Sequence, residues 1–287
     1  MFMDYKKNSN LTNIDIKTVE SFGNEWNYFN QNNKSDQNLK KVFKNYFSIF
    51  PFEKINKSSV GMDVGCGSGR WSYFIAPLVK NIYCIDPSEN SIKIAKKNLK
   101  NYDNCIFMNE SANTIKLKNN SIDFGYSLGV LHHVPDTLLA LKNCIDKLKP
   151  GSPFLLYLYY NFENRNFVFR FIWLISNIIR ILVSRLPFFL KRIITDFIAV
   201  FAYYPLAKIY KFFKLLGLNN INLPLSFYHN KSLYMMRTDS LDRFGTKLEK
   251  RFSKKDIENL MKESNLENIT FLNSEPYWVA VGYKIEK

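Results

Sequence analysis

The amino-acid sequence predicts an α/β fold built on a doubly wound, mostly parallel sheet. Three observations lead to this prediction. Short apolar runs typical of buried strands alternate with helix-like patterns from residue 60 to residue 160. A glycine-rich turn at residues 65–69 follows the first of these runs directly and precedes a helical pattern. A last pair of strand patterns surrounds Pro276, downstream of a long aromatic and basic segment.

Each element is expected from its local composition. Short apolar runs predict five strands, at 60–64, 82–85, 105–109, 121–127 and 154–160. Apolar residues at helical spacing, preceded by capping residues or followed by Gly or Pro, predict helices at 70–80, from Ser88, at 136–147 and at 253–262. The last strand pair is expected at 269–272 and 277–285.

The turn after the first strand is predicted to hold a nucleotide-like ligand. Asp63 is followed by glycines at alternate positions, Gly65, Gly67 and Gly69. Glycine has no Cβ, so the main chain can take unusual φ values and a ligand can lie directly against it. A dinucleotide fingerprint spaces its glycines G-x-G-x-x-G, which differs from the spacing here.

The second predicted strand ends in Asp86 and Pro87, about twenty residues beyond the glycine turn. Ligands of open parallel sheets bind at the carboxyl ends of strands, where a carboxylate can accept both hydroxyls of a ribose. The alternative is that Asp86 only caps the helix that begins near Ser88.

The third and fourth strands lead into Glu110-Ser111-Ala112 and into the run from Ser127-Leu128 to His132-His133-Val134-Pro135-Asp136. Together with the glycine turn and Asp86, this run resembles the type 11 family of class I S-adenosylmethionine-dependent methyltransferases, most of which act on small molecules. The resemblance implies a Rossmann-like sheet of seven strands with an antiparallel last strand, and it covers residues 60–136.

The same resemblance implies roles for individual residues. Asp63, Gly65 and Gly67 would hold the methionyl end of S-adenosylmethionine, Asp86 its ribose, and Ser111 with the Ala112 backbone its adenine. Many relatives have Asp where this chain has Ser111, which weakens that assignment. Further cofactor contacts are expected from Cys66, Pro87, Ser127, Leu128 and Trp26, the last within an aromatic cap that begins at Phe22.

The residues expected to act on the acceptor are less well defined. His132 or His133 is the natural general base, with His229 in reserve, because imidazole titrates near neutrality. The alternative is that both histidines enter a helix and are satisfied by backbone carbonyls. Acceptor contacts are expected from Tyr160, Asn161, Tyr228 and Arg237, although the last two also suit a salt-bridged surface elbow.

The resemblance implies methyl transfer by in-line displacement to oxygen or carbon of a small or lipid-like acceptor, such as a quinone precursor or a glycan or lipid intermediate. S-adenosylhomocysteine would be the product. Two other classes stay open: an RNA methyltransferase, and a catalytically silent binding or scaffold protein. A nicotinamide dehydrogenase is disfavoured by the glycine spacing. The basic residues alternate with bulky aliphatic ones instead of forming a polar arm, so nucleic acid ranks low as a partner.

Composition and charge limit the domain organisation that the chain can have. With 287 residues, 46% of them hydrophobic, the chain can bury one large core and carry an insertion. We expect an N-terminal helical cap at 1–50, a cofactor-binding core at 51–160 and 251–287, and a helical insertion at 161–250. The four cysteines show no C-x-x-C pair, which favours reduced core residues in a cytoplasmic protein without a metal site.

The insertion holds much of the chain's net charge of +15: residues 165–215 contain nine Lys and Arg and one Asp. Its apolar runs, 171–179 and 197–207, are each shorter than the roughly twenty residues that cross a bilayer. We expect basic amphipathic helices, broken at Pro187 and Pro205, that lie at the inner membrane face or form a lid or dimer surface. The alternative is that their apolar residues face an ordinary core.

Overall fold

The computed structural model describes residues 13–28, 37–218 and 223–286. The chain forms two compact units, the first comprising Met1–Glu163 and Leu248–Lys287 and the second Asn164–Lys247. The second unit lies within residues 161–250, where an insertion is expected, and the described part of the N-terminal segment belongs to the first unit.

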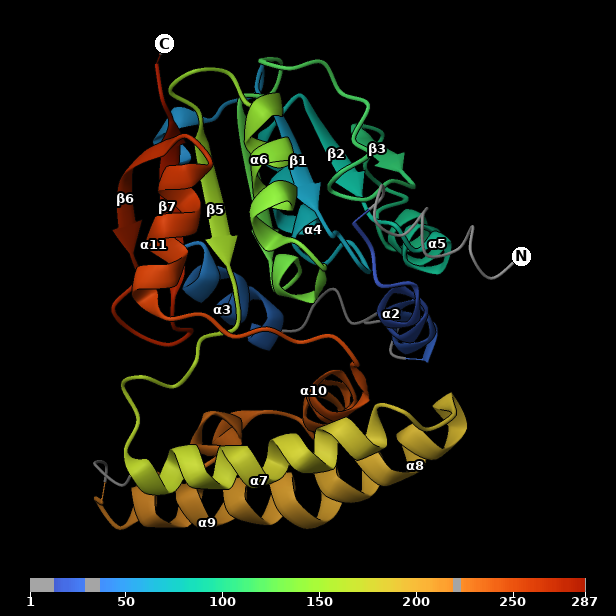
Figure 1. Ribbon diagram of the computed structural model, residues 1–287, viewed down its shortest axis with the longest axis vertical. Helices are drawn as coiled ribbons and strands as arrows, with labels where there is room; N and C mark the ends of the chain where they lie inside the picture. Colours follow the sequence, from blue (N-terminus) through green and yellow to red (C-terminus); the bar gives the residue numbers. More distant parts are fainter. Residues whose placement is uncertain (1–12, 29–36, 219–222, 287) are drawn as a thin grey trace. The chain divides into compact units, whose positions relative to one another are not determined.

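The first unit is built on one seven-stranded sheet in the order β3-β2-β1-β4-β5-β7-β6 (Figure 1). Its strands are β1 (Val60–Val64), β2 (Asn81–Ile85), β3 (Cys105–Met108), β4 (Phe124–Leu128), β5 (Pro153–Tyr157), β6 (Leu266–Phe271) and β7 (Val279–Lys284). β1 to β5 pair in parallel, and β7 runs antiparallel between β5 and β6. The predicted fold class, a mostly parallel sheet with an antiparallel last strand, is confirmed.

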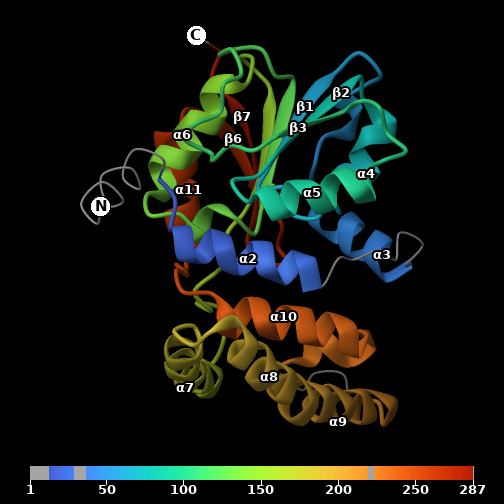
Figure 2. The same cartoon turned by 90° about the vertical axis from the view of Figure 1, so that its right-hand side faces the viewer.

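Helices cover both faces of this sheet (Figure 2). The α-helices described in this unit are α2 (Ile16–Tyr28), α3 (Gln37–Tyr46), α4 (Ser72–Ile75), α5 (Glu89–Asn98), α6 (Thr137–Lys147) and α11 (Lys254–Glu263), of which α2 packs against α5. Helix α11 begins at its predicted cap, Ser253, which forms a capping box with Asp256. Helix α6 was expected to include Asp136, and the structure makes Asp136 its N-cap, which accepts from the N–H of Leu139.

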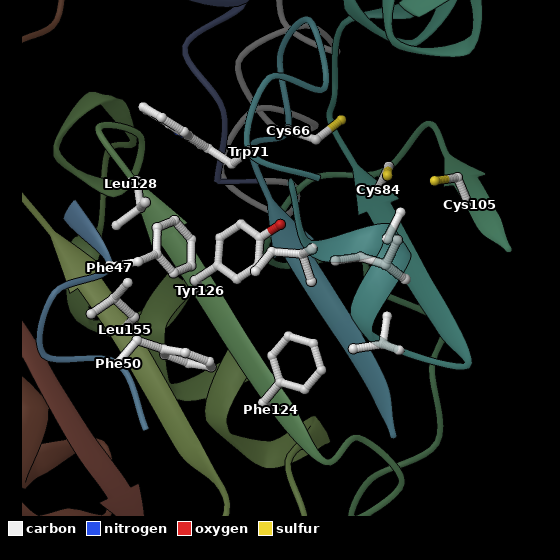
Figure 3. Packing of buried hydrophobic residues seen from close by; sticks show 14 of the residues in the cluster. Phe47, Phe50, Cys66, Trp71, Cys84, Cys105, Phe124, Tyr126, Leu128 and Leu155 are labelled. Carbon is white, nitrogen blue, oxygen red and sulfur yellow. The ribbon is translucent and has the colours of Figure 1, made fainter. Parts of the chain in front are cut away.

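The core lies on both faces because successive strand residues point to opposite sides. On one face, Phe124 and Tyr126 of β4 pack with Phe47, Phe50 and other buried residues (Figure 3). The rings of Phe47 and Tyr126 meet edge to face at 5.2 Å between centroids. This aromatic layer fixes α3 and the segment after it against the sheet. On the other face, Met62, Phe154 and Leu156 pack with the apolar residues of α6 and α11.

Two predicted segments are shorter in the structure. The helix expected at 70–80 is only α4, followed by a 3₁₀ turn at Ala76–Leu78, because Pro77 has no N–H to continue an α-helix. The strand expected at 154–160 ends at Tyr157, and beyond it Tyr160 makes only an isolated bridge to Phe252.

The second unit consists of helices α7 (Phe167–Val183), α8 (Phe188–Ile198), α9 (Tyr204–Leu215) and α10 (Leu233–Gly245). α10 packs against α7 and α8. The predicted break at Pro187 is confirmed, since Pro187 is the N-cap of α8. The predicted break at Pro205 is wrong. A π-helical turn at Ala199–Tyr203 joins α8 to α9, and Pro205 lies in the first turn of α9, where a missing N–H is tolerated.

Candidate functional site

The glycine turn after β1 is tied to the end of β2. The N–H groups of Gly65 and Cys66 both donate to the carbonyl of Ile85, at 2.8 and 3.0 Å. Gly65 and Gly67 have φ values of 78° and 52°, which side chains rarely adopt. A Cβ on Gly65 would also lie 2.4 Å from a methyl carbon of Val130, so this position requires glycine for space as well as for conformation.

Asp86 is held at the centre of the same edge of the sheet. One carboxylate oxygen accepts the N–H of Gly67 at 3.0 Å, and the other accepts the N–H of Ser88 at 2.9 Å. Ser88, and not Asp86, is the N-cap of α5, because its hydroxyl accepts the N–H of Ser91. The capping interpretation of Asp86 is therefore wrong. Each oxygen keeps lone pairs for a further donor, which suits the two hydroxyls of a ribose.

The Asp86 side chain is nearly buried, and this burial raises its pKa to about 6. The N–H groups of Ser88 and Gly67 act in the opposite direction, because they stabilise the ionised form. The carboxyl therefore titrates close to neutral pH instead of near its ordinary value of 3.8.

Asp63 lies deeper, at 1% exposure. It accepts a hydrogen bond of 2.6 Å from the Ser72 hydroxyl, which lies 3.4 Å from the Tyr126 hydroxyl. Burial raises the pKa of Asp63 to about 7. The Asp63 side chain is thus tied to Ser72 of α4, and its role towards the methionyl end of the cofactor stays a prediction.

The remaining predicted cofactor residues lie at the carboxyl ends of β3 and β4. Ser111 accepts the N–H of Asn113 and donates its own N–H to Thr114, which forms a tight turn after β3. Ala112 follows it and is buried. Ser127 donates to the carbonyl of Val64 at 2.9 Å and so joins the ends of β4 and β1. Leu128 is buried, and Cys66 and Pro87 flank Gly67 and Asp86 respectively.

The two histidines differ in their surroundings. Nδ1 of His133 lies 2.6 Å from the carbonyl of Leu248, so it carries the proton and donates. His132 is fully buried against the ring of Tyr159, with 3.9 Å between centroids, and neither of its ring nitrogens has a hydrogen-bond partner among the described residues. The alternative in which a backbone carbonyl accepts a hydrogen bond from the imidazole therefore holds for His133 and not for His132.

The surroundings of His132 also shift its pKa. Burial lowers its pKa well below the usual 6.5, and the neighbouring His133 and Arg251 act in the same direction. The ring is therefore neutral at physiological pH, and its surroundings disfavour the protonated form.

Helix α2 packs against α5, and this helix with the residues just before it supplies contacts that the sequence did not predict. Asn13, just before it, accepts the Asp136 N–H at 2.7 Å and donates to the Asp136 carbonyl. The Phe22 ring lies 4.9 Å from that of His133, and Gly23 approaches so closely that a Cβ would lie 2.5 Å from the Ser88 hydroxyl. The aromatic pattern at Phe22 was a signal for this cap. Trp26 belongs to α2, but its side chain lies outside the described part of the structure.

Tyr160 and Asn161 follow β5. Tyr160 is buried, with its ring 4.7 Å from that of Phe162, whereas Asn161 is exposed and accepts the N–H of Glu163. Sequence reasoning missed Arg251, which donates to the Tyr160 carbonyl at 3.0 Å and pairs with the buried carboxylate of Glu249. Nothing local distinguished this arginine from the many others.

The other predicted residues belong to the second unit and have partners there. Tyr228 donates to Asp239, and Arg237 forms a two-point ion pair with Asp196 at 2.7 and 2.8 Å. Nδ1 of His229 contacts the Ser226 carbonyl. These contacts are of the kind expected for the surface-elbow interpretation, and the roles of the three residues towards an acceptor stay predictions.

Residues 62–156 match the family model of type 11 methyltransferases, which is described as a methyltransferase domain. The chain carries a class I S-adenosylmethionine-dependent methyltransferase domain of type 11. The match spans β1 to β5 and includes the glycine turn, Asp86 and both histidines.

Curated relatives match part of this chain. The demethylmenaquinone methyltransferase of Staphylococcus aureus strain JH9 is 29% identical over 133 residues, which cover 40% of this chain and 55% of the relative. The same figures hold for that of strain Newman. This chain thus spans about half the length of the curated relatives it matches.

Solved structures share the fold over more of the chain. A methyltransferase from Thermotoga maritima, described as a possible histamine N-methyltransferase, superposes with a TM-score of 0.50 at 15% identity and covers 93% of this chain and 99% of its own. One from Bacillus halodurans also has a TM-score of 0.50, at 14% identity, and covers 80% of this chain and 71% of its own. At these identities, the likeness concerns the fold.

The residues present fit the cofactor of this class, S-adenosylmethionine. A glycine turn with left-handed backbone lets a ligand approach the main chain, and beside it a nearly buried carboxylate offers free lone pairs to hydroxyl donors.

Proposed function

We propose that this chain transfers a methyl group from S-adenosylmethionine to oxygen or carbon of a small or lipid-like acceptor. The observation that carries the proposal is the Asp86 carboxylate, fixed between the N–H groups of Gly67 and Ser88 at the carboxyl end of β2. A carboxylate held in this way is preorganised for a ribose, and the methyltransferase domain match supports that use.

When bound, the cofactor supplies an electrophilic methyl group on a sulfonium. The work of the chain is then mainly to hold two reactants in line, which can supply several kcal/mol of the barrier. In this proposal Asp86 accepts the ribose hydroxyls and the backbone of Gly65 and Gly67 lies along the methionyl end. Ser111 and Ala112 border the adenine.

We assign proton acceptance to His132. Its ring is neutral at pH 7, it is shielded from water, and neither nitrogen is used by another described residue. A general base that takes a proton from an acceptor hydroxyl or acidic carbon typically contributes about 10²- to 10⁴-fold in rate. The hydrogen bond from His133 to the Leu248 carbonyl fixes the His133 ring beside the ring of His132, so His133 acts as a positioning residue for His132.

A quinone precursor is the acceptor we favour. The curated relatives are demethylmenaquinone methyltransferases by name, and the aromatic rings of Tyr157 and Tyr159 follow one another at the end of β5, next to His132. Flat aromatic rings pack well on such side chains. A glycan or lipid intermediate is the next acceptor to test.

Calorimetric titration of the purified protein with S-adenosylmethionine, S-adenosylhomocysteine and NAD tests the cofactor. We expect both sulfur compounds to bind, Asp86→Ala to lose that binding, and Asp103→Ala, which removes an exposed carboxylate, to keep it. Binding of NAD alone would overturn the proposal. Transfer of isotope-labelled methyl to demethylmenaquinone, compared with a lipid-linked glycan, then tests the acceptor.

A further inference from the structure

The second unit exposes a large apolar surface. Among the described residues, 28 large hydrophobic side chains are exposed, and 25 of them lie within Asn164–Lys247. Ten of these belong to α7 alone, and Phe167 is 80% exposed. Soluble monomers rarely expose contiguous apolar patches beyond a few hundred Å², so such a surface indicates an apolar partner.

Part of the α8–α9 helix has an inverted polarity. The buried residues of the α8–α9 helix recur every four positions, and three of them are Lys191, Thr195 and Ala199. The opposite side of the helix exposes Phe197 and Phe201, whose rings lie 4.2 Å apart. A helix in water normally places its polar side outward, whereas this helix buries a lysine and exposes phenylalanines.

The buried polar groups have partners inside the unit. Lys191 donates to the carbonyl of Gly245 at 3.0 Å, and the buried Arg180 donates to those of Thr246 and Lys247, also at 3.0 Å. Two cations thus satisfy carbonyls at the C-terminal end of α10, where the helix dipole favours positive charge. Both buried cations are thus hydrogen-bonded inside the unit, while many large apolar side chains stay exposed.

We propose that α7, α8 and α9 lie in the interface of an anionic lipid bilayer, with their exposed apolar side chains among the acyl chains. Charge complementarity selects this partner. The unit contains thirteen Lys and Arg against three Asp, a net +10. Six cationic side chains are exposed, namely Arg170, Arg185, Lys208, Lys211, Lys214 and Lys247. Two copies joined through such faces would repel one another, whereas anionic lipids attract them.

The helices lie in the interface and do not cross the bilayer. The continuous helix Phe188–Leu215 has 28 residues and is long and apolar enough to span, which corrects the expectation that each apolar run is too short. Its uncharged stretch between Asp196 and Lys208, however, covers about 16 Å, about half of a hydrocarbon core of about 30 Å. Asp196 is also ion-paired to Arg237 of α10. A helix that lies in the plane of the membrane keeps the charged groups of Asp196 and Arg237 at the level of the polar lipid headgroups.

Cosedimentation of the full chain with vesicles tests this proposal independently of methyl transfer. One vesicle is phosphatidylcholine alone, and the other contains phosphatidylcholine and phosphatidylglycerol in equal parts. We expect binding to the anionic vesicle, weakened by salt, and much less to the neutral one. Equal binding to both vesicles, or to neither, would overturn the proposal.

Paired variants separate the apolar contribution from the electrostatic one. Phe197→Ser with Phe201→Ser should abolish most binding, whereas Leu78→Ser with Leu139→Ser, exposed residues of the first unit, should leave it unchanged. Both pairs change exposed side chains, so circular dichroism should show native folding. If the Phe pair instead converts a dimer to a monomer and the wild type ignores vesicles, a second copy is the partner and the proposal fails.

The charge variant replaces Lys208, Lys211 and Lys214 by Gln. With each lysine near an anionic surface contributing about 1 kcal/mol, we expect binding to weaken about a hundredfold. The matched control replaces the exposed Lys97, Lys100 and Lys118 of the first unit and should change binding less than about twofold. An equal loss in both sets would mean non-specific attraction and would contradict a dedicated docking surface.

Discussion

The buried carboxyl of Asp63 should make the stability of this protein fall as pH rises. Its pKa is raised from 3.8 to about 7, chiefly because burial penalises the charged form. A group whose pKa is higher in the folded state stabilises the fold below its unfolded pKa, and this stabilisation is lost as pH rises through the folded value. Between pH 5 and pH 8 the free energy of unfolding should therefore drop by about 2.5 kcal/mol from this residue alone.

Asp63→Asn isolates this contribution. Asparagine keeps an oxygen that can accept the Ser72 hydroxyl, but it does not ionise. Urea denaturation at pH 5 and pH 8 gives the free energy of unfolding of both proteins, and the wild type should lose about 2.5 kcal/mol more than the variant. Asp86 titrates with the same sign in both proteins and cancels in this difference.

The refuting result is an equal pH dependence in the two proteins, which would mean that Asp63 is already ionised at pH 5. A second variant tests the same assignment if Asp63→Asn does not fold. Ser72→Ala removes the hydrogen bond that lowers the pKa of Asp63, so it should move the pH-dependent loss of stability to higher pH. A shift to lower pH would contradict the assignment.

Three further predictions concern the site. Affinity for S-adenosylmethionine should fall as pH is lowered through about 6, because Asp86 must be ionised to accept hydroxyls, and calorimetry should find Asp86→Asn weaker and independent of pH there. With S-adenosylmethionine saturating, so that Asp86 is already engaged, the acid limb of the acceptor's kcat/KM profile should lie well below pH 6.5, and His132→Gln should remove it while cofactor affinity is retained; an acid limb at 6.5 under these conditions would exclude the buried ring as base. Gly65→Ala should destabilise more than Gly129→Ala in thermal unfolding, because both have φ of 78° but only the first meets Val130, at 2.4 Å.

Local signals predicted the sheet and its cofactor edge. Apolar runs marked β1 to β5, and the glycine spacing marked the turn. The cap at Ser253 was visible because a capping residue acts on N–H groups three positions away. Asp86 was predictable for a similar reason, since the end of an apolar strand fixes its place in the sheet.

Interactions distant in sequence could not be predicted in this way. Which of the two histidines is satisfied depends on the Leu248 carbonyl, 115 residues from His133. The placement of α2 depends on Asn13, which reaches Asp136 across 123 residues. The continuity of the helix through Pro205 depends on a π-helical turn that packs against α10. None of these has a periodicity or a motif of its own.

The sequence described the composition of the insertion correctly but left its polarity open, and polarity is what separates the two interpretations. Had the apolar residues faced a core, Arg180 and Lys191 would lie at the surface with their charges in water. The structure buries both cations and places them on the terminal carbonyls of α10. Since those carbonyls need donors in any surroundings, this part of the unit is satisfied without solvent. Apart from six exposed cations, the large side chains that stay outside are mainly apolar, and water is a poor solvent for them. An arrangement of this kind is stable beside acyl chains, where a quinone-like acceptor also dissolves.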